Sequence, residues 1–291
     1  MAISLIAILL TLLLSHALPE LPSWRNFTWV RTWALQLQSV TNSGFRLAAT
    51  LGIPTLLCYL VQTNIHNSLF GFLYFFFALT VLLYCWGPRD LPRDVEAIFK
   101  APDSERREAA VQALRVENGS SAIPLQATAL VDACFQSSLK RWFGVLFWFV
   151  VLGPAGALLY RMTQIVAYSS ASETENNQTA ALARNWAQAL DWFPAHLMAL
   201  SLALVSDFDA VFRTWRDYHA AEGRGFFTLQ LGFLSALAHA SVDADVVAET
   251  ERATAVYDPL LELADALQLL HRVLMVWLTV LALIVLGGWA A

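Results

Sequence analysis

Three polar side chains recur at four-residue steps just before a long apolar run. Asp132, Gln136 and Lys140 share one ridge of a predicted helix, because residues four apart in a helix lie on the same face. An ammonium group near an amide can bind a neutral or anionic ligand, so this ridge is a candidate ligand-binding site. Charged helix faces are more often simply solvated, and the sequence alone leaves both interpretations open.

A cation and a carboxylate stand beside other apolar runs. Arg161 lies near the end of one run, and an unpaired cation costs about 2.5 kcal/mol or more at the membrane centre and less near its surface. Arg161 is therefore either a ligand-binding or relay residue, or a cation that reaches the lipid headgroups. Asp191 opens the next run and can pair with Arg161 or act as an anion at a helix N-terminus. Arg89 and Asp94 follow an earlier run, where a cytosolic anchor explains Arg89.

Signatures of common active sites are missing from the sequence. The chain has no G-x-x-x-x-G-K-[ST] phosphate loop and no G-x-S-x-G elbow, and its 6 His residues include no pair three or four apart. Its 3 Cys residues form no C-x-x-C pair. We therefore predict no catalytic residues, no metal site and no cofactor. A net charge of -5 gives no basic field for a polyanion, so nucleic acid is a poor candidate partner.

The composition indicates the environment in which these residues lie. Hydrophobic residues make up 57% of the 291 residues, charged residues make up only 14%, and the mean hydropathy is +0.53. Soluble domains carry roughly 25% charged residues. We therefore predict an integral membrane protein whose main partner is the lipid bilayer. Long apolar runs without an alternating β pattern predict an all-α, multi-pass chain that forms a single membrane domain.

Five apolar runs approach the length of about 20 residues that a helix needs to cross a membrane. They cover residues 45–62, 69–86, 143–167, 190–205 and 273–289. The third run contains Gly153-Pro154-Ala155-Gly156, which frees backbone groups that hydrocarbon cannot satisfy. That run can therefore be a re-entrant pair of half-helices instead of a span. The shorter N-terminal run 3–14 is predicted to be an interfacial or re-entrant helix.

The positions of Lys and Arg give the chain an orientation. With five spans, all of the 18 basic residues except Arg161 and Arg184 fall in segments assigned to the cytosol. A re-entrant third run would move everything after the fourth run to the opposite side. We therefore favour five spans.

The large loops 87–141 and 206–272 are predicted to be helical and cytosolic. Residues 89–115 have apolar positions at helical spacing, Pro92 suits a first turn, and Asp103 can cap the next helix. Further helices are predicted at 125–142, 226–239 and 246–270. We expect these helices to continue or cover the membrane helices.

Several short motifs stand in an order that resembles a known superfamily. They are Gly87-Pro88-Arg89-Asp90-Leu91, Leu146-Phe147-Trp148, the stretch from Gly153 through Tyr160-Arg161, and Leu190-Asp191-Trp192-Phe193-Pro194-Ala195-His196. Over roughly residues 40 to 215 the chain is similar to the CbiB/CobD-type membrane proteins. These include adenosylcobinamide-phosphate synthase and the AmpE proteins linked to β-lactamase induction. The resemblance adds Tyr160 and also His196, which stands where an Arg is usual, to the candidate ligand-binding residues.

The acidic residues of the synthase branch are replaced in this chain. That enzyme joins an amine to a corrin carboxylate. The resemblance implies a site in which carboxylates surround the substrate and the metal. The matching positions here are Gln136, Lys140, Ala167 and the pair Ala187-Gln188. Their loss removes the ligands that a divalent metal would need. What remains looks like AmpE.

The resemblance implies a regulatory function. We expect a bacterial inner-membrane protein of the AmpE type, without catalysis, that senses cell-wall turnover products upstream of β-lactamase induction and antibiotic resistance. A small cell-wall-derived or other small molecule would bind in the degenerate pocket, and a homo-oligomer stays open. The alternative is a surviving amide-forming enzyme of cobalamin biosynthesis. A transporter has little support, because the apolar runs hold few ionisable residues.

Overall fold

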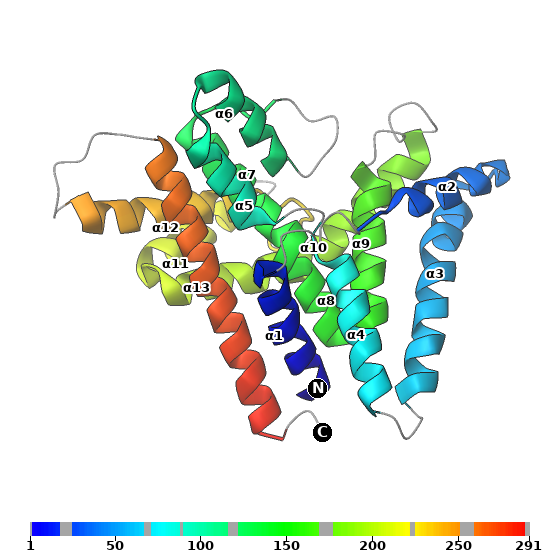
Figure 1. Ribbon diagram of the computed structural model, residues 1–291. Helices are drawn as coiled ribbons and strands as arrows, with labels where there is room; N and C mark the ends of the chain where they lie inside the picture. The colour runs from blue at the N-terminus through cyan, green and yellow to red at the C-terminus, as the bar shows by residue number, and fades with distance from the viewer. Residues whose placement is uncertain are drawn as a thin grey trace.

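The computed structural model describes residues 2–17, 25–66, 71–87, 90–115, 122–168, 177–221, 225–250 and 259–288. Within these ranges the structure is helical and contains no β-strand, which confirms the all-α prediction (Figure 1). The helices are α1 (Ala2–Ala17), α2 (Thr28–Gln36), α3 (Ser43–His66), α4 (Gly71–Cys85), α5 (Leu91–Lys100), α6 (Ser104–Val111), α7 (Ala127–Ser138), α8 (Gly144–Leu152), α9 (Pro154–Tyr168), α10 (Asn177–Val205), α11 (Phe208–Ala220), α12 (Gly232–Thr250) and α13 (Pro259–Leu286).

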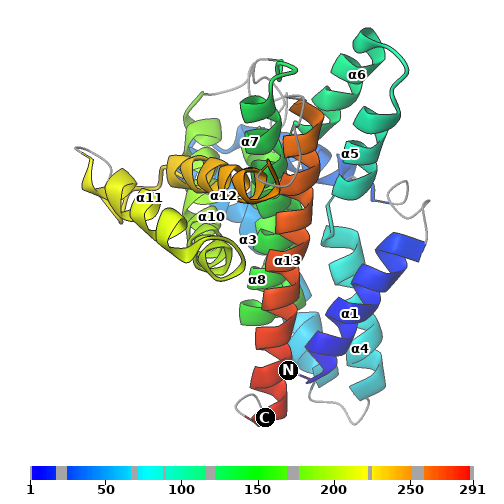
Figure 2. The same cartoon turned by 90° about the vertical axis from the view of Figure 1, so that its left-hand side faces the viewer.

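A bundle of lengthwise helices forms one half of the molecule. Among the described helices, α3, α10 and α13 are long and apolar enough to cross a membrane, and α1 and α4 are shorter apolar helices. α3, α4, α8, α9 and α13 run along a common direction, with α1 beside α4 (Figures 1 and 2). Large apolar side chains on their outer surfaces are exposed, including Leu56, Leu57, Phe72 and Leu283. Such extensive apolar exposure is expected of surfaces that face lipid.

The apolar run predicted at 143–167 is two helices. Gly153 separates α8 from α9 and has a φ of 73°, a left-handed conformation that favours glycine. Gly144 of α8 lies so close to the Tyr160 ring of α9 that a side chain there would overlap it, and Gly156 is equally close to the backbone of α8. α9 therefore folds back along α8 as a hairpin. The structure thus has the pair of helices that the glycines and proline left open, and membrane re-entry of this pair stays a prediction.

A side chain of α3 satisfies the backbone at the hairpin turn. The Gln62 amide nitrogen donates to the Leu152 carbonyl oxygen at 3.4 Å, and Gln62 Oε1 accepts a hydrogen bond from the Ala155 amide at 3.2 Å. Backbone groups at helix ends have no partner within their own helix, and hydrocarbon cannot supply one. The turn of the hairpin is therefore tied to α3.

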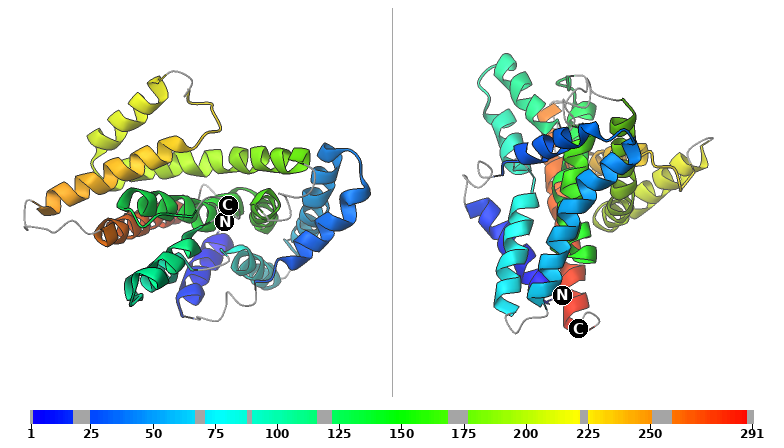
Figure 3. Two further views of the ribbon diagram at one scale, coloured as in Figure 1. Left: turned by 90° about the horizontal axis from the view of Figure 1, so that it is seen from above. Right: turned by 90° about the vertical axis from the view of Figure 1, so that its right-hand side faces the viewer.

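α10 differs from the predicted run 190–205 in both length and direction. It begins at Asn177 and continues through Pro194 to Val205. Seen from above, α10, α11 and α12 lie lengthwise, whereas α8, α9 and α13 are foreshortened (Figure 3). α10 therefore crosses the bundle instead of running with it, although its length and composition would suit a span.

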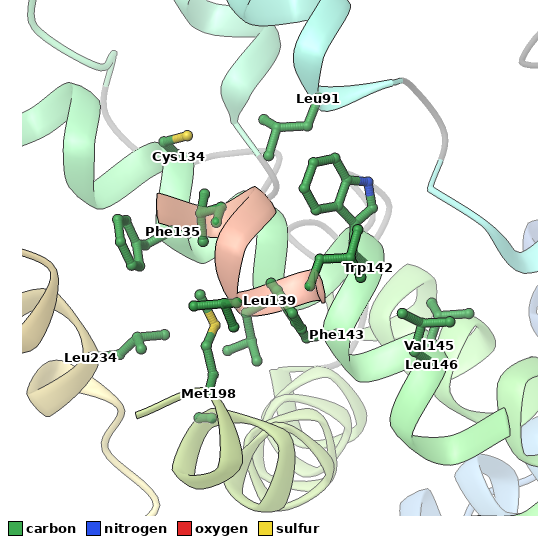
Figure 4. Close-up of a cluster of buried hydrophobic side chains, with 14 of the residues drawn as sticks. Leu91, Cys134, Phe135, Leu139, Trp142, Phe143, Val145, Leu146, Met198 and Leu234 are labelled. Carbon is green, nitrogen blue, oxygen red and sulfur yellow. The ribbon is translucent and has the colours of Figure 1, made fainter. Parts of the chain in front are cut away.

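α7 and α8 belong to one helix that is interrupted by a π-helical turn, Leu139–Phe143. All residues of the π turn are buried. A π turn accommodates an additional residue, and such turns occur frequently at functional sites. Figure 4 shows Leu139 and Phe143 in the hydrophobic core near Met198 of α10, with Leu234 of α12 on the same side. The core thus lies where the α7–α8 helix meets the crosswise helices.

The helices at the other end of the bundle follow several local signals in the sequence. Pro92 lies in the first turn of α5, and the Asp103 carboxylate caps α6 by accepting a hydrogen bond from the Arg106 amide at 2.7 Å. The helix expected at 226–239 begins only at Gly232. The segment expected at 246–270 covers the end of α12 and the start of α13, which continues into the closing apolar run.

Candidate functional site

A cavity of about 200 Å³ lies between the π turn, α9, α10 and the start of α12. We call it the site cavity, and its lining residues are Gln136, Leu139, Lys140, Tyr168, Gln188, Asp191, Leu229, Leu231, Gly232 and Leu234. One ammonium group and one carboxylate therefore line the same small space. A groove of about 530 Å³ between α2 and α3 is lined by uncharged residues, including Trp29 and Trp33, and offers less polar chemistry.

Lys140 reaches the site cavity from the π turn. Only 6% of this residue is exposed, and its Nζ lies 4.1 Å from the centre of the Tyr168 ring. An aromatic face stabilises a cation by about 0.5–2 kcal/mol, with the larger values where water is excluded. Burial also removes water that would otherwise compete for the ammonium group. Lys140 can therefore bind an anionic or strongly polar group of a ligand.

Asp191 lies in the opposite wall and is 1% exposed. Its Oδ1 accepts a hydrogen bond from the Tyr160 hydroxyl at 2.5 Å and another from Gln164 Nε2 at 2.8 Å. Hydrogen bonds to a charged acceptor are stronger than neutral ones and hold its position. This network fixes Asp191 against α9, so the carboxyl group has a defined position in the cavity wall.

Two arginines add positive charge at the end of α4. Arg161 is buried, and its Nε donates to the Cys85 carbonyl oxygen at 2.8 Å. Arg25 Nη1 donates to the Gly87 carbonyl oxygen at 2.5 Å. Burial, followed by the charge of Arg161, lowers the pKa of Arg25 to about 10. The Arg25 guanidinium remains protonated at neutral pH, because an Arg pKa near 10 still leaves the cation dominant.

Asp94 lies away from the site cavity. Its Oδ2 pairs with Arg141 Nη1 at 2.6 Å, and Arg141 Nη2 donates to the Ala113 carbonyl oxygen at 2.7 Å. The pair joins α5 to the π turn and is largely shielded from solvent, with side-chain exposures of 12% and 4%. The prediction that Asp94 belongs to the ligand site is therefore not supported by its position. Arg89, predicted with it, lies outside the described residues.

Asp132 also lies outside the cavity wall. Its Oδ1 accepts a hydrogen bond from the Ser235 hydroxyl and lies 3.0 Å from His239 Nε2. These contacts join α7 to α12. Of the predicted ridge, only Gln136 and Lys140 line the cavity, because Asp132 lies one helical turn before Gln136 and contacts α12.

His196 occupies an aromatic cluster instead of the cavity. Its Nδ1 lies 2.8 Å from the Trp192 carbonyl oxygen. Its ring centre lies 4.1 Å from that of Trp192 and 4.6 Å from that of Phe233. Its position therefore packs α10 against α12, and the anion-binding role implied by the usual Arg does not follow from it.

Several lining residues were not recognised from the sequence. Gln164, which holds Asp191, and Tyr168, which lines the cavity, follow the predicted Tyr160 at four-residue steps on α9, so helical spacing was a usable signal for both. Gln188 stands three residues before Asp191 and carries the same kind of signal. The apolar residues of the segment 229–234 had none, because they come close only through the tertiary fold.

The structure defines a class: an all-helical membrane protein with a small cavity lined by a buried lysine and a hydrogen-bonded aspartate. Within the described residues, no group of three or more His, Cys, Asp and Glu side chains is placed to hold a metal ion. The cavity can thus bind a small molecule by charge and hydrogen bonding. Among the described lining residues the cavity has one carboxylate, which by itself is a poor donor set for a divalent cation that takes six or more oxygen ligands.

Comparison with known proteins supports one distant relationship. A stretch of 95 residues, 31% of the chain, is 32% identical to the cobalamin biosynthesis protein CobD of Chromobacterium violaceum. The match covers 29% of that protein, so the chain matches less than a third of its length. No protein-family model matches the chain, and no solved structure matches it. The chain is therefore related to CobD/CbiB-type proteins, as the ordered motifs indicated. The match gives no support for a relationship to AmpE.

Proposed function

We propose that this chain is a multi-pass inner-membrane sensor of the AmpE type, which binds a small anionic product of cell-wall turnover and is linked to β-lactamase induction. One observation carries the proposal: the site cavity contains a buried ammonium group, Lys140, opposite an Asp191 carboxylate that is already held by Tyr160 and Gln164. Such a cavity selects a ligand by charge and shape, with the anion toward Lys140 and donor groups toward Asp191.

Binding of a ligand at this position can change the packing of the surrounding helices. Lys140 belongs to the α7–α8 helix, Asp191 to α10 and Leu234 to the first turn of α12. A ligand shifts a conformational equilibrium only if it binds one arrangement more tightly than the other. We expect the cavity to act in this way, because several helices share its wall and a change in their spacing would change its fit to the ligand.

Binding is tested with purified protein in lipid nanodiscs and a soluble muropeptide mixture prepared from peptidoglycan. We expect saturable binding by calorimetry and a weakening of about 10- to 100-fold in Lys140→Met, since a hydrogen bond to a charged group contributes about 1.5–3 kcal/mol. Lys100→Met is the matched control, because Lys100 is exposed and pairs with Glu96 on α5. Equal binding by the two variants would exclude the site cavity.

The regulatory role is tested in a Gram-negative host with an inducible β-lactamase. We expect deletion of the gene to change induction by a β-lactam, and the wild-type gene, but not Lys140→Met, to restore it. Both variants must reach the membrane in equal amounts. Full restoration by Lys140→Met would disconnect the cavity from regulation.

The relationship to CobD favours one alternative, an amide-forming enzyme of the cobinamide-phosphate synthase class. It requires the chain to join an amine to a corrin carboxylate. Incubating the purified protein with a corrin acid, a phosphorylated amino alcohol, ATP and millimolar Mg²⁺, followed by mass spectrometry, decides between the two. Corrin amide formation would replace the sensor proposal.

A further inference from the structure

The exposed surface of α10 is divided into an apolar side and a polar side. Large apolar residues, all exposed, recur every three, four or seven positions, so they share one side of the helix. They are Leu182, Trp186, Phe193, Leu197, Leu200 and Leu204, and we call them the α10 stripe. The exposed residues outside the stripe in the first half of the helix include Arg184, Asn185 and Gln188. The side between them is buried and includes Ala183, Ala187 and Asp191.

The apolar surface continues beyond α10. Phe208 and Phe212 of α11 are exposed and stack on each other with ring centres 5.7 Å apart. Phe227, in the segment that follows α11, is 90% exposed. Exposed aromatic and aliphatic side chains in this number are uncommon on proteins that face only water. They therefore call for a partner that accepts apolar groups.

The lengthwise helices mark the thickness of an apolar layer. Residues 47–66, 71–85, 142–160 and 273–288 contain no Asp, Glu, Lys or Arg. Three of these stretches begin directly after Arg46, Arg141 and Arg272, and one of them ends directly before Arg161. These arginines therefore mark one edge of the layer, and the hairpin turn at Gly153 lies within the uncharged part.

Contacts place α10 at this charged edge. Arg46 Nη2 donates to Thr179 Oγ1 at 2.8 Å, near the start of α10. Trp277 Nε1 donates to Ser201 Oγ at 2.9 Å, near its end. Trp277 follows Arg272 by five residues, or about 7.5 Å of helix at 1.5 Å per residue. Amphipathic helices in a membrane surface sink by about 5–10 Å, which is the same depth.

We infer that α10 and α11 lie in the plane of the membrane, with the α10 stripe, Phe208 and Phe212 in contact with lipid acyl chains at the charged edge. Two observations make lipid the partner. The stripe lies at the level where the lipid-facing surface of the lengthwise helices ends, and α10 crosses those helices (Figure 3). This inference does not depend on the proposed function.

The same arrangement resolves the orientation of the chain. The hairpin returns the chain to the edge from which it entered, and an in-plane α10 keeps it there. α11 and α12 then stay on the side of α5 to α7, and Arg184 joins the other basic residues on that side. The positive-inside distribution becomes more complete than with five spans.

The test uses single-cysteine variants of the full chain in proteoliposomes of phosphatidylethanolamine and phosphatidylglycerol. Cys58 is replaced by Ser, and the buried Cys85 and Cys134 are replaced as well only if the protein remains folded without them. Nitroxide labels at Leu200 and Phe212 are compared with a label at Asn185, using oxygen and a water-soluble nickel complex as relaxing agents. Leu57 of α3 serves as the lipid-facing control and Arg106 of α6 as the aqueous control.

We expect Leu200→Cys and Phe212→Cys to resemble the Leu57 label, with high access to oxygen and little to nickel, and Asn185→Cys to resemble the Arg106 label. Access to nickel at all three positions would overturn the inference. Exclusion of both reagents at Leu200, together with disulfide-linked dimers of Leu200→Cys, would make the stripe an interface between two copies and overturn it equally.

Sidedness gives an independent readout in whole cells. We expect Asn185→Cys and Asp217→Cys to react with a membrane-impermeant maleimide from the same side. Reaction from opposite sides would show that α10 crosses the membrane, and the inference would be wrong.

Discussion

Lys140 and Arg141 are adjacent cations in one buried π turn, and their surroundings differ. Arg141 pairs with Asp94 and also donates to the Ala113 carbonyl, so its charge is neutralised by the protein. Lys140 lies over the face of Tyr168 and lines a cavity. The two cations therefore differ in role: the Arg141 guanidinium joins two elements through a carboxylate, whereas the Lys140 ammonium lies in a cavity wall, where a ligand can contact it.

The largest effect is expected where the neutralised pair is broken. Arg141→Met leaves the Asp94 carboxylate buried without its guanidinium partner, and such a loss costs about 3–5 kcal/mol. Chemical unfolding in detergent measures this change. Lys100→Met, which removes an exposed pair, should unfold as the wild type does. An Arg141 variant as stable as the wild type would show that the pair does not hold α5 in place.

A smaller effect is expected at the carboxylate of the cavity wall. Asp191→Ala leaves the Tyr160 hydroxyl and Gln164 amide without their acceptor, at a cost of about 1–3 kcal/mol. Asp191→Asn retains an oxygen at the same position and should recover part of this loss. Thermal unfolding of both variants gives the comparison. Equal losses in the two would mean that the network contributes nothing beyond packing.

The contact between Lys140 and Tyr168 should be weaker still. A double-mutant cycle of Lys140→Met and Tyr168→Leu isolates their interaction, for which we expect a coupling of about 0.5–2 kcal/mol. The free energy of unfolding of all four proteins is measured under one condition. Strictly additive losses of unfolding free energy would show that the Tyr168 ring does not help to hold Lys140.

Cys134 supplies a local probe with almost no expected signal in the native protein. Burial raises the pKa of its thiol to about 12, and because only the thiolate reacts, labelling at about pH 8 should be absent. We expect labelling of Cys134 to appear in Arg141→Met, where α5 and the π turn lose their connection, and to stay absent in Lys140→Met. Peptide mapping identifies the labelled residue. Labelling of Cys134 in both variants would show that Lys140 and Arg141 do not differ in how they hold this region together.

Local signals in the sequence predicted local structure well. Pro92 and Asp103 lie in the helix starts that their residue types favour, because these preferences act within one turn of the chain. Gln136 and Lys140 line one cavity as their spacing indicated. Whether 143–167 crosses or returns could not be decided, because both arrangements use the same apolar residues. The turn is decided by Gln62, which is distant in sequence.

The rest of the site depends on tertiary structure. Asp132 was expected in the ligand site with Gln136, but its contacts are to Ser235 and His239 of α12, outside the cavity wall. Nothing in the composition of α10 reveals that it crosses the other helices, since a span and an in-plane helix have similar apolar content. The segment 229–234 carries no pattern that would connect it with Lys140.

The hydrogen bonds of Gln62 hold the hairpin turn in place. The start of α9 is therefore a fixed end, which we call its foot, and the helix can act as a lever. From Ala155 to Tyr168 the helix extends about 20 Å at 1.5 Å per residue, and its other end, at Tyr168, lines the cavity. A tilt of a few degrees about the foot displaces Tyr168 by more than an ångström while hardly moving the turn. Whatever enters the cavity therefore acts where the lever arm is longest.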